Sequence, residues 1–301
     1  MDQHERPIFA LILRLASALL FATMFMLVKL AGERGAHLPE IMFWRQGIAA
    51  IVMLAWLLPA RQMHLLKTEN IGRHVARTGI GMIGMIFGFS AVTLLPLAEA
   101  TMLGFTAPLF AVLITALVVR DRVGPWRWSA VVVGFAGVLI ITQPGNASLS
   151  ALGLAAGLGA ALVVAIVSFQ IKSLARIDGP TSVAFYFSLF GALVTAPFLP
   201  FYFTAHNEAH WLILIGCGLA GALGQLLASF SLRHGAVATV MIMDYTSLIW
   251  ATLFGYFVFD RLPPYAIWIG APIIIMAGMI VMWREHRLSR AVPPAIPQDV
   301  D

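Results

Sequence analysis

Four ionisable residues of this sequence stand inside long apolar runs: Lys29, Arg45, Glu99 and Asp244. A charge inside a membrane span costs at least about 2.5 kcal/mol on insertion scales, so such a residue usually faces a cavity or a partner. Asp244 lies about 12 Å into its run, counted from Ala236 at about 1.5 Å per helical residue. We predict that Asp244, with the hydroxyl of Tyr245 beside it, binds a substrate ammonium group or a proton. The alternative is a carboxylate neutralised by a buried arginine or held by a helix-packing hydrogen bond.

The other three ionisable residues lie closer to the ends of their runs. The guanidinium of Arg45 could hold a substrate carboxylate through two hydrogen bonds. It could equally extend to the outer interface or pair with a carboxylate between helices. Glu99 begins a predicted helix, where a carboxylate suits the helix dipole, and we expect it to cap that helix or to pair with Lys29 or Arg45 at a gate. Lys29 is expected to extend to water.

Uncharged polar and aromatic residues supply further candidates for the binding site. Gln170 and Gln225 lie within apolar runs, where an amide needs a partner across a helix interface or a place in a wet cavity. Several aromatic rings could stack on a ring-bearing substrate, or could pack in the core and against lipid: Trp44, Phe89, Phe105, Tyr186 and Trp250. We include Trp44 in the predicted binding site because it adjoins Arg45.

Motifs typical of soluble enzymes are missing from the sequence. No His-Glu-x-x-His and no GxxxxGK[ST] pattern occurs, so neither a zinc protease site nor an ATP-binding loop is expected. His206 and His210 have a spacing that would suit a metal on a helix, although a solvated loop is the simpler interpretation. The single cysteine, Cys217, allows no intrachain disulfide. We therefore expect no cofactor, no metal and no catalytic residue.

The composition indicates that lipid is the main solvent of the chain. Of its 301 residues, 60% are hydrophobic and 11% are charged, and the mean hydropathy is +0.89. Soluble proteins carry about 25% charged residues. The net charge of +5 does not indicate a nucleic-acid partner, because the basic residues are scattered between apolar runs instead of forming a patch. The first apolar run has no short-core cleavage pattern and reads as a retained membrane helix.

Ten segments are long enough to cross a bilayer, which takes about 20 apolar residues. They are residues 10–31, 40–58, 74–94, 98–119, 126–142, 150–173, 180–201, 211–232, 236–258 and 265–283. With the N-terminus inside, 15 of the 19 Lys and Arg residues fall in inside loops and tails. Because positive loops stay cytoplasmic, we predict a multi-pass protein of the cell (inner or plasma) membrane with both termini cytoplasmic.

The two halves of the sequence resemble each other weakly but in order. The segment "RDRVGPW" at 120–126 corresponds to "FDRLPPY" at 259–265, and "FWRQGIA" at 43–49 corresponds to "YFSLFGA" at 186–192. Five helices in each half force the second half to enter the membrane upside down. We therefore predict an inverted repeat, with a first unit at 1–145, a second at 146–288 and a disordered tail at 289–301.

One glycine pattern imitates a dinucleotide-binding motif. Gly216, Gly218 and Gly221 have GxGxxG spacing, but residues 211–232 carry no charge and have no polar face that could lie in water. A dinucleotide site needs a strand before the glycines and an amphipathic helix after them. We interpret these glycines as places where membrane helices approach closely.

The chain resembles the drug/metabolite transporter superfamily, specifically its EamA type, over about residues 10–285. The resemblance rests on "FWRQGIA", on "LAEATMLGFTAPLFAVLITALVVRDR" with Pro108, and on "MDYTSLIWATLFGYFVFDRLPPY". Asp121 and Asp260 stand where the family usually has Glu, and the second half lacks a proline matching Pro108. The resemblance implies a secondary transporter with a central cavity that moves a small organic solute.

We therefore expect uptake or efflux of a small metabolite, such as an amino acid, a nucleobase or a cofactor-like solute, by alternating access. The predicted site residues are Asp244, Tyr245, Gln225, Gln170, Arg45, Trp44 and Glu99. A proton or a counter-solute is the expected coupling partner. The alternatives are a channel, which would favour a ring of repeated polar residues, and a membrane-embedded enzyme, which would need paired carboxylates or a histidine cluster.

Overall fold

The computed structural model describes residues 7–121, 123–143, 149–174, 177–203, 205–235 and 240–291, and this part of the chain contains helices and loops but no strand. It has ten helical segments that are long and apolar enough to cross a membrane. This confirms the prediction of an all-α membrane protein with ten spans. Residues 236–239, where the ninth predicted span begins, lie outside the described ranges. So do residues 292–301 of the predicted tail, while the last helix continues to Ala291.

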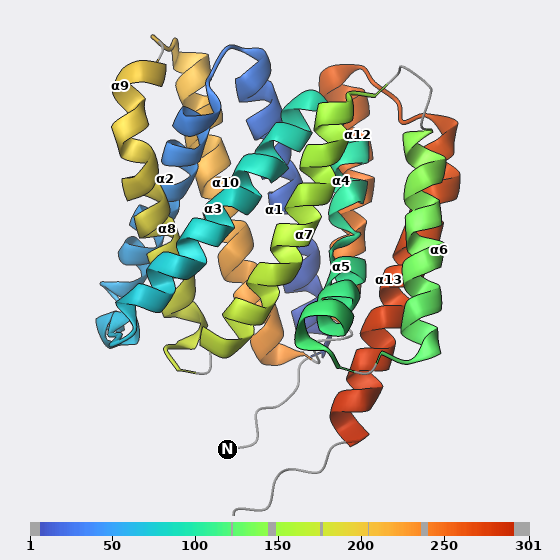
Figure 1. Cartoon of the computed structure of the whole chain (residues 1–301). Helices are drawn as coiled ribbons and strands as arrows, with labels where there is room; N and C mark the ends of the chain where they lie inside the picture. Colours follow the sequence, from blue (N-terminus) through green and yellow to red (C-terminus); the bar gives the residue numbers. More distant parts are fainter. Residues whose placement is uncertain are drawn as a thin grey trace, which may run out of the picture.

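The spans follow the chain order shown in Figure 1. They are α1 (Pro7–Glu33), α2 (Leu38–Leu57), α3 (Ile71–Leu94), α4 (Leu97–Gly104) continued by α5 (Ala107–Ile114) and the π-helical turn η2 (Thr115–Val119), α6 (Pro125–Thr142), α7 (Ala151–Leu174), α8 (Gly179–Thr195) continued by η3 (Ala196–Phe198) and α9 (Leu199–Tyr202), α10 (Glu208–His234), η4 (Ile242–Thr246) continued by α12 (Ser247–Phe259), and α13 (Tyr265–Ala291). A short 3-10 turn, η1 (Met63–Leu66), lies between α2 and α3.

The fourth span is broken in its middle. α4 ends at Gly104, and α5 begins at Ala107 with Pro108 in its first turn. Proline suits this position because its missing N–H would have had no partner inside the helix. The break places Phe105 and Thr106 between two short helices instead of inside one long helix.

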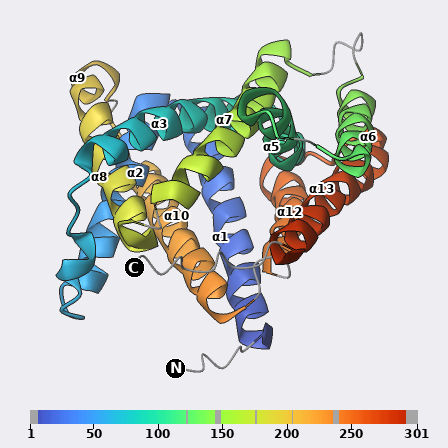
Figure 2. The same cartoon turned by 60° about the horizontal axis from the view of Figure 1, so that its bottom comes forward.

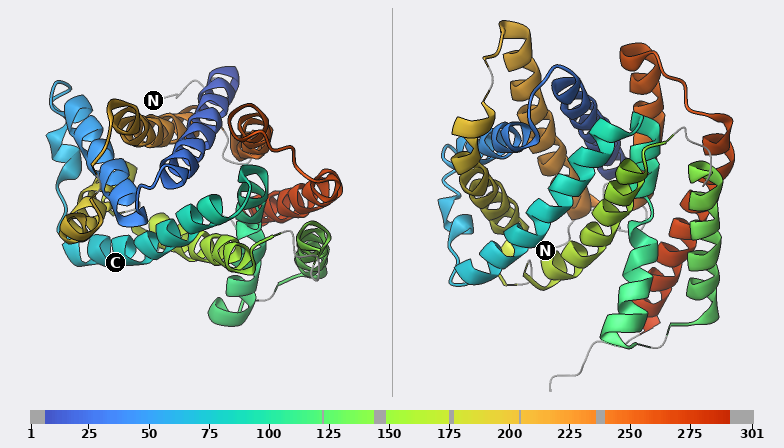
Figure 3. Two further views of the ribbon diagram at one scale, coloured as in Figure 1. Left: turned by 90° about the horizontal axis from the view of Figure 1, so that it is seen from above. Right: turned by 45° about the horizontal axis from the view of Figure 1, so that its top comes forward.

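Helices from the first half of the sequence pack against helices from the second half. α1 lies along α10, and α3 lies along α7; α2 packs on α8, α4 on α12, and α6 on α13. Seen from above, α1 stands in the middle, with α3 and α7 along one side and α6 and α13 as an outlying pair (Figure 3). Figure 1 shows that α1 begins and α13 ends at the same end of the bundle, and the tilted view in Figure 2 shows the same arrangement from below.

The glycines of the GxGxxG pattern lie inside α10, which is a continuous helix of 27 residues. A Cβ atom added to Gly218 would lie 2.6 Å from Cβ of Ile48 on α2. That distance is too short for two carbon atoms, so only glycine allows the two helices to meet there. The predicted use of these glycines in close helix packing is confirmed at this position.

We expect Gly218→Ala to lower the free energy of unfolding by about 1–2 kcal/mol, because overpacking costs about 1–3 kcal/mol and the gain in helix propensity returns at most about 1 kcal/mol. The measurement is the apparent Tm of the purified protein in detergent. Gly47→Ala on α2 is the matched control, because a Cβ there meets nothing within 4 Å. Equal Tm values for the two variants would contradict this account of the contact.

A carboxylate joins the loop between α7 and α8 to the start of α3. Oδ2 of Asp178 accepts a hydrogen bond from Oγ1 of Thr68 at 2.8 Å and lies 3.0 Å from Nε2 of His74. Burial of Asp178 works to raise its pKa, but its hydrogen bonds with Thr68 and His74 outweigh burial, so the pKa lies below its usual value. A lowered pKa means that the ionised carboxylate stabilises the folded protein.

We expect Asp178→Asn to lower the apparent Tm at pH 7 and at pH 5, by the equivalent of about 1–2 kcal/mol. Because the folded pKa is depressed, this stabilisation is present above the ordinary carboxyl pKa and is lost as the pH falls through the lower folded value. The difference between the variant and the parent should therefore shrink only below about pH 4. A difference that already disappears between pH 7 and pH 5 would contradict the assignment of this stabilisation to the ionised carboxylate of Asp178.

Candidate functional site

A cavity of about 550 Å³ lies between α1, α2, α3, α4, α7 and α8. Five phenylalanines line it: Phe21, Phe25, Phe89, Phe105 and Phe187. Ligand sites for small molecules have volumes of about 300–1,000 Å³ and mostly apolar walls with a few placed polar groups. The cavity therefore has the size and lining of a metabolite site with room for a ring system.

Small residues of α3 and α7 create much of this space. Arg77, Gly81, Gly84 and Gly88 line the cavity, and their spacing of four, three and four residues places them on one face of α3. A Cβ added to Gly84 would lie 2.8 Å from a methyl group of Val163 on α7, whereas one added to Gly88 would meet only Cβ of Ala160, at 3.9 Å. The two helices touch at Gly84 and leave open space at Gly88.

Two arginines supply the positive charge at the cavity wall. Arg45 of α2 and Arg77 of α3 are each 9% exposed. The guanidinium carbon of Arg77 lies 3.9 Å from the centre of the Phe187 ring, and that of Arg45 lies 5.9 Å from the same centre. Both guanidinium groups therefore share one aromatic ring of α8.

The amide of Gln46 positions Arg45. Its Oε1 accepts a hydrogen bond from Nη1 of Arg45, and its Nε2 donates to the carbonyl of Phe187 at 3.1 Å. Nε of Arg45 and both Nε and Nη1 of Arg77 are buried and have no hydrogen-bond partner. Among the described residues that line the cavity there is no Asp or Glu. The wall thus contains two guanidinium groups with no carboxylate opposite them.

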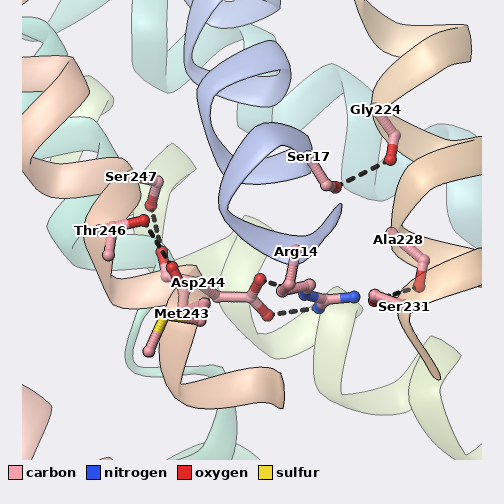
Figure 4. A network of polar contacts seen from close by, with 9 residues as sticks. All are labelled: Arg14, Ser17, Gly224, Ala228, Ser231, Met243, Asp244, Thr246 and Ser247. Carbon is pink, nitrogen blue, oxygen red and sulfur yellow. Dashed lines mark hydrogen bonds and ion pairs between the residues drawn. The ribbon is translucent and has the colours of Figure 1, made fainter. Parts of the chain in front are cut away.

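Asp244 pairs with an arginine of the first helix. Its two carboxylate oxygens accept hydrogen bonds from Nε and Nη2 of Arg14, both at 2.5 Å, and Figure 4 shows the two side chains facing each other between α1 and η4. Asp244 does not line the cavity. Ser247 does, and its hydroxyl donates to the carbonyl of Asp244 at 2.6 Å. This arrangement agrees with the alternative interpretation of Asp244, in which an arginine neutralises the carboxylate.

The remaining predicted site residues are dispersed around the cavity. The Tyr245 ring packs on Phe105, with centres 4.9 Å apart, and the Trp44 ring packs on Trp211 at 5.0 Å. Gln170 lies on α7 beside the cavity-lining Ile171, and its Oε1 is buried without a partner. None of Tyr245, Trp44 and Gln170 lines the cavity.

Three further candidates, Gln225, Tyr186 and Trp250, also lie outside the main cavity. Gln225 borders a separate hollow of about 20 Å³ between α2, α8 and α10. Of the aromatic candidates, Phe89 and Phe105 line the main cavity, whereas Tyr186 and Trp250 do not. The structure thus brings Arg45, but not the two amides, to the cavity wall.

Glu99 and Lys29 border a small hollow at the start of α4. The amine of Lys29 donates hydrogen bonds to the carbonyls of Val92 and Leu95 at 3.1 and 2.9 Å and lies 3.7 Å from a carboxylate oxygen of Glu33. Lys29 is 6% exposed, so the expectation that it extends to water is wrong. No ion pair joins Glu99 to Lys29 or Arg45 among the described residues, and one oxygen of the buried Glu99 has no partner.

The loop before α10 is exposed at Ala205 and Asn207, but the side chain of His206 turns inward from it. Nε2 of His206 lies 2.5 Å from a carboxylate oxygen of Glu40, and both side chains are almost fully buried. The rings of His206 and His210 are 4.9 Å apart. No group of three or more metal-ligating residues occurs within the described ranges. His206 therefore belongs to an exposed loop, as expected, but its side chain is not solvated.

Arg77 and Phe187 are the cavity residues that the sequence reasoning missed. Arg77 falls within the predicted span 74–94, but it was counted with the basic residues of the inside loop at 59–77; in the structure it lies within α3, which begins at Ile71. A signal was available, because Arg77 is in helical register with Gly81, Gly84 and Gly88. Phe187 lies in "YFSLFGA", at the position that corresponds to Trp44 in "FWRQGIA", but nothing else distinguishes it among the 20 phenylalanines of the chain.

Comparison with known proteins gives matches along nearly the whole chain. The model of the EamA-like transporter family matches residues 8–143 and 151–283. A riboflavin transporter of Vibrio cholerae is 29% identical over 96% of this chain and 98% of that protein, and a pseudopaline exporter of Pseudomonas aeruginosa is 25% identical over 92% of this chain and 96% of that protein. A crystal structure with 21% sequence identity has a TM-score of 0.63 and covers 94% of this chain and 99% of its own chain.

Proposed function

This chain belongs to the EamA-like transporter family, and from that premise we propose that its central cavity is the site at which one small organic metabolite is carried by alternating access. The chain is a multi-pass membrane transporter and not an enzyme. The observation that carries the proposal is the cavity of about 550 Å³ with its five phenylalanines and two buried arginines. These groups suit a solute with a flat ring body and a polar end.

We infer that the moving parts are two inverted halves, residues 1–145 and 146–288. The helix packing supports this division. In this division α1 corresponds to α7, α2 to α8, and α3 to α10. The α1–α10 contact then has the α7–α3 contact as its counterpart, and the α2–α10 contact has the α8–α3 contact. Transporters of this kind rock one repeat against the other around a site at their interface, where this cavity lies.

We propose that both termini are cytoplasmic and that the protein works in the cell (inner or plasma) membrane. The distribution of Lys and Arg supports this orientation, and so does the position of the start of α1 and the end of α13 at one end of the bundle (Figure 1). On this orientation the Arg14–Asp244 pair lies toward the cytoplasmic end of the cavity, where it would hold α1 to η4 as a gate.

A proton or a counter-solute is the proposed energy source, because the sequence has no ATP-binding loop. Glu99 is the candidate proton carrier, since its buried carboxyl group has an unpartnered oxygen. The two relatives named above are a riboflavin transporter and an exporter, so membership of the family fixes neither the solute nor the direction of transport for this chain.

The proposal is tested with the purified protein in proteoliposomes. A thermal-shift screen against a metabolite library, with riboflavin as its first member, selects a ligand, because binding to the folded state raises apparent stability by mass action. The labelled ligand should then enter saturably, and faster when the same unlabelled ligand is trapped inside. Flux that stays linear with concentration, together with an ohmic current, would indicate a channel and contradict the proposal.

A further inference from the structure

We infer that the substrate carries an anionic oxygen group, a carboxylate or a phosphate, which binds between Arg45 and Arg77 while its ring body lies among the phenylalanines of the cavity. This inference rests on the proposed function of the cavity and adds the chemical class of what the cavity binds. It begins from an imbalance of charge at the cavity wall.

The imbalance appears when the two cavity arginines are compared with the four ion pairs formed by the described residues. Arg14 pairs with Asp244 and Lys29 with Glu33, and the two other pairs are formed by histidines. Arg45 and Arg77 are also buried, each 9% exposed, yet neither has a carboxylate partner among the described residues. A buried guanidinium without a counter-charge is costly, so such groups are normally paired.

The local packing holds the two guanidinium groups open for a ligand. A Cβ added to Gly81 would lie 3.2 Å from Nη1 of Arg77 and 2.8 Å from the Phe187 ring, and one added to Gly221 would lie 3.2 Å from Nε of Arg45. Glycine at these two positions therefore makes room for the charged heads. The contact of Arg77 with the Phe187 ring lowers the cost of its burial, but it does not use the N–H donors at the guanidinium edge.

Those donors define the chemistry of the missing partner. Nε of Arg45 and both Nε and Nη1 of Arg77 are buried and have no hydrogen-bond partner. The guanidinium edge is a planar fork that matches the oxygens of a carboxylate or phosphate in two parallel hydrogen bonds. A neutral ring alone would leave the donors unsatisfied and the charges unbalanced. The remaining polar lining, Thr101, Ser168 and Ser247, carries no charge.

The first experiment compares ligands that differ only in charge. The purified protein in detergent is titrated with two pairs of ligands while thermal unfolding is recorded. The first pair is 2-naphthoate and its neutral analogue 2-naphthamide, and the second is riboflavin 5′-phosphate and its neutral analogue riboflavin. One or both anions should bind at least about tenfold more tightly than the neutral analogue, a difference in binding free energy of about 1.4 kcal/mol. The two pairs separate a carboxylate site from a phosphate site.

The second experiment removes one charge at a time. Without ligand, Arg77→Met should leave the apparent Tm unchanged or raise it, because a buried unpaired charge is replaced by an apolar chain of similar length. Arg14→Met is the matched control and should lower the Tm, since it leaves Asp244 unpaired. Arg77→Met should also abolish the preference for the anion, while Arg77→Lys keeps part of it.

Three results would overturn the inference. These are equal binding of anion and neutral analogue in both pairs, no shift with either anion, and a Tm of Arg77→Met that falls as far as that of Arg14→Met. The first result would leave the cavity as a binding site for neutral solutes, so the proposed function would survive. Loss of saturable counterflow for every ligand would instead contradict the proposed function itself.

Discussion

Gly88→Phe should reduce substrate flux by at least about a hundredfold, the equivalent of about 2.7 kcal/mol of lost binding, while the apparent Tm stays close to that of the parent chain. Gly88 lines the cavity, and an added Cβ meets only Cβ of Ala160, at 3.9 Å. The phenyl ring can therefore enter the cavity without displacing the helix packing. Replacing a mid-helix glycine also improves helix propensity by up to about 1 kcal/mol.

Gly79→Phe is the matched control for this variant. Gly79 lies on the same helix, is exposed, and has nothing within 4 Å of an added Cβ, but it does not line the cavity. Flux and ligand-induced thermal shift are measured for both variants in the same lipid. Normal flux through Gly88→Phe would remove this cavity from the transport path.

Reversing the charge of either member of the Arg14–Asp244 pair should lower stability by about 1–3 kcal/mol and stop transport. The estimate lies between the value for an exposed pair, about 0–1 kcal/mol, and that for a broken buried pair, about 3–5 kcal/mol. The side chain of Arg14 is 11% exposed and that of Asp244 is 39% exposed, which places the pair between these limits. Arg14→Asp and Asp244→Arg are the single variants.

The double variant carrying both substitutions separates a gate from a binding site. A gate needs only an attractive pair between α1 and η4, so the reversed pair should recover most of the stability and part of the flux, as coupled neighbours do in a double-mutant cycle. A carboxylate that binds the substrate or the coupling proton itself would not be replaced by this exchange. Recovery of the Tm without any flux would therefore assign Asp244 to the binding chemistry.

The spans were predictable because the bilayer imposes a strong and local rule. Every one of the ten predicted segments corresponds to a helical segment of the structure, and the errors lie at the ends. One such end concerns the site: α3 begins three residues before the predicted start at residue 74. Arg77 lies inside the predicted span, but it was counted with the basic residues of the preceding loop, and its register with Gly81 was not considered.

The partners of buried charges were not predictable in the same way. The pairing of Arg14 with Asp244 and that of His206 with Glu40 join residues 230 and 166 positions apart. Such pairs depend on which helices pack together, and hydrophobic periodicity contains no information on that. The sequence could indicate that a buried charge needs a partner. Only the packing identifies the partner, or shows, as at Arg45, that none of the described residues supplies a counter-charge.

The unpaired arginines have an electrical consequence for the direction of transport. If the solute brings the only negative charge into this cavity, then each transport cycle carries that charge across the membrane voltage. Moving one elementary charge through 100 mV is worth about 2.3 kcal/mol, and an interior-negative cell expels anions. A monoanion moving alone would therefore run outward at a ratio of about fiftyfold, and accumulation inside the cell would require at least one cation to enter with it.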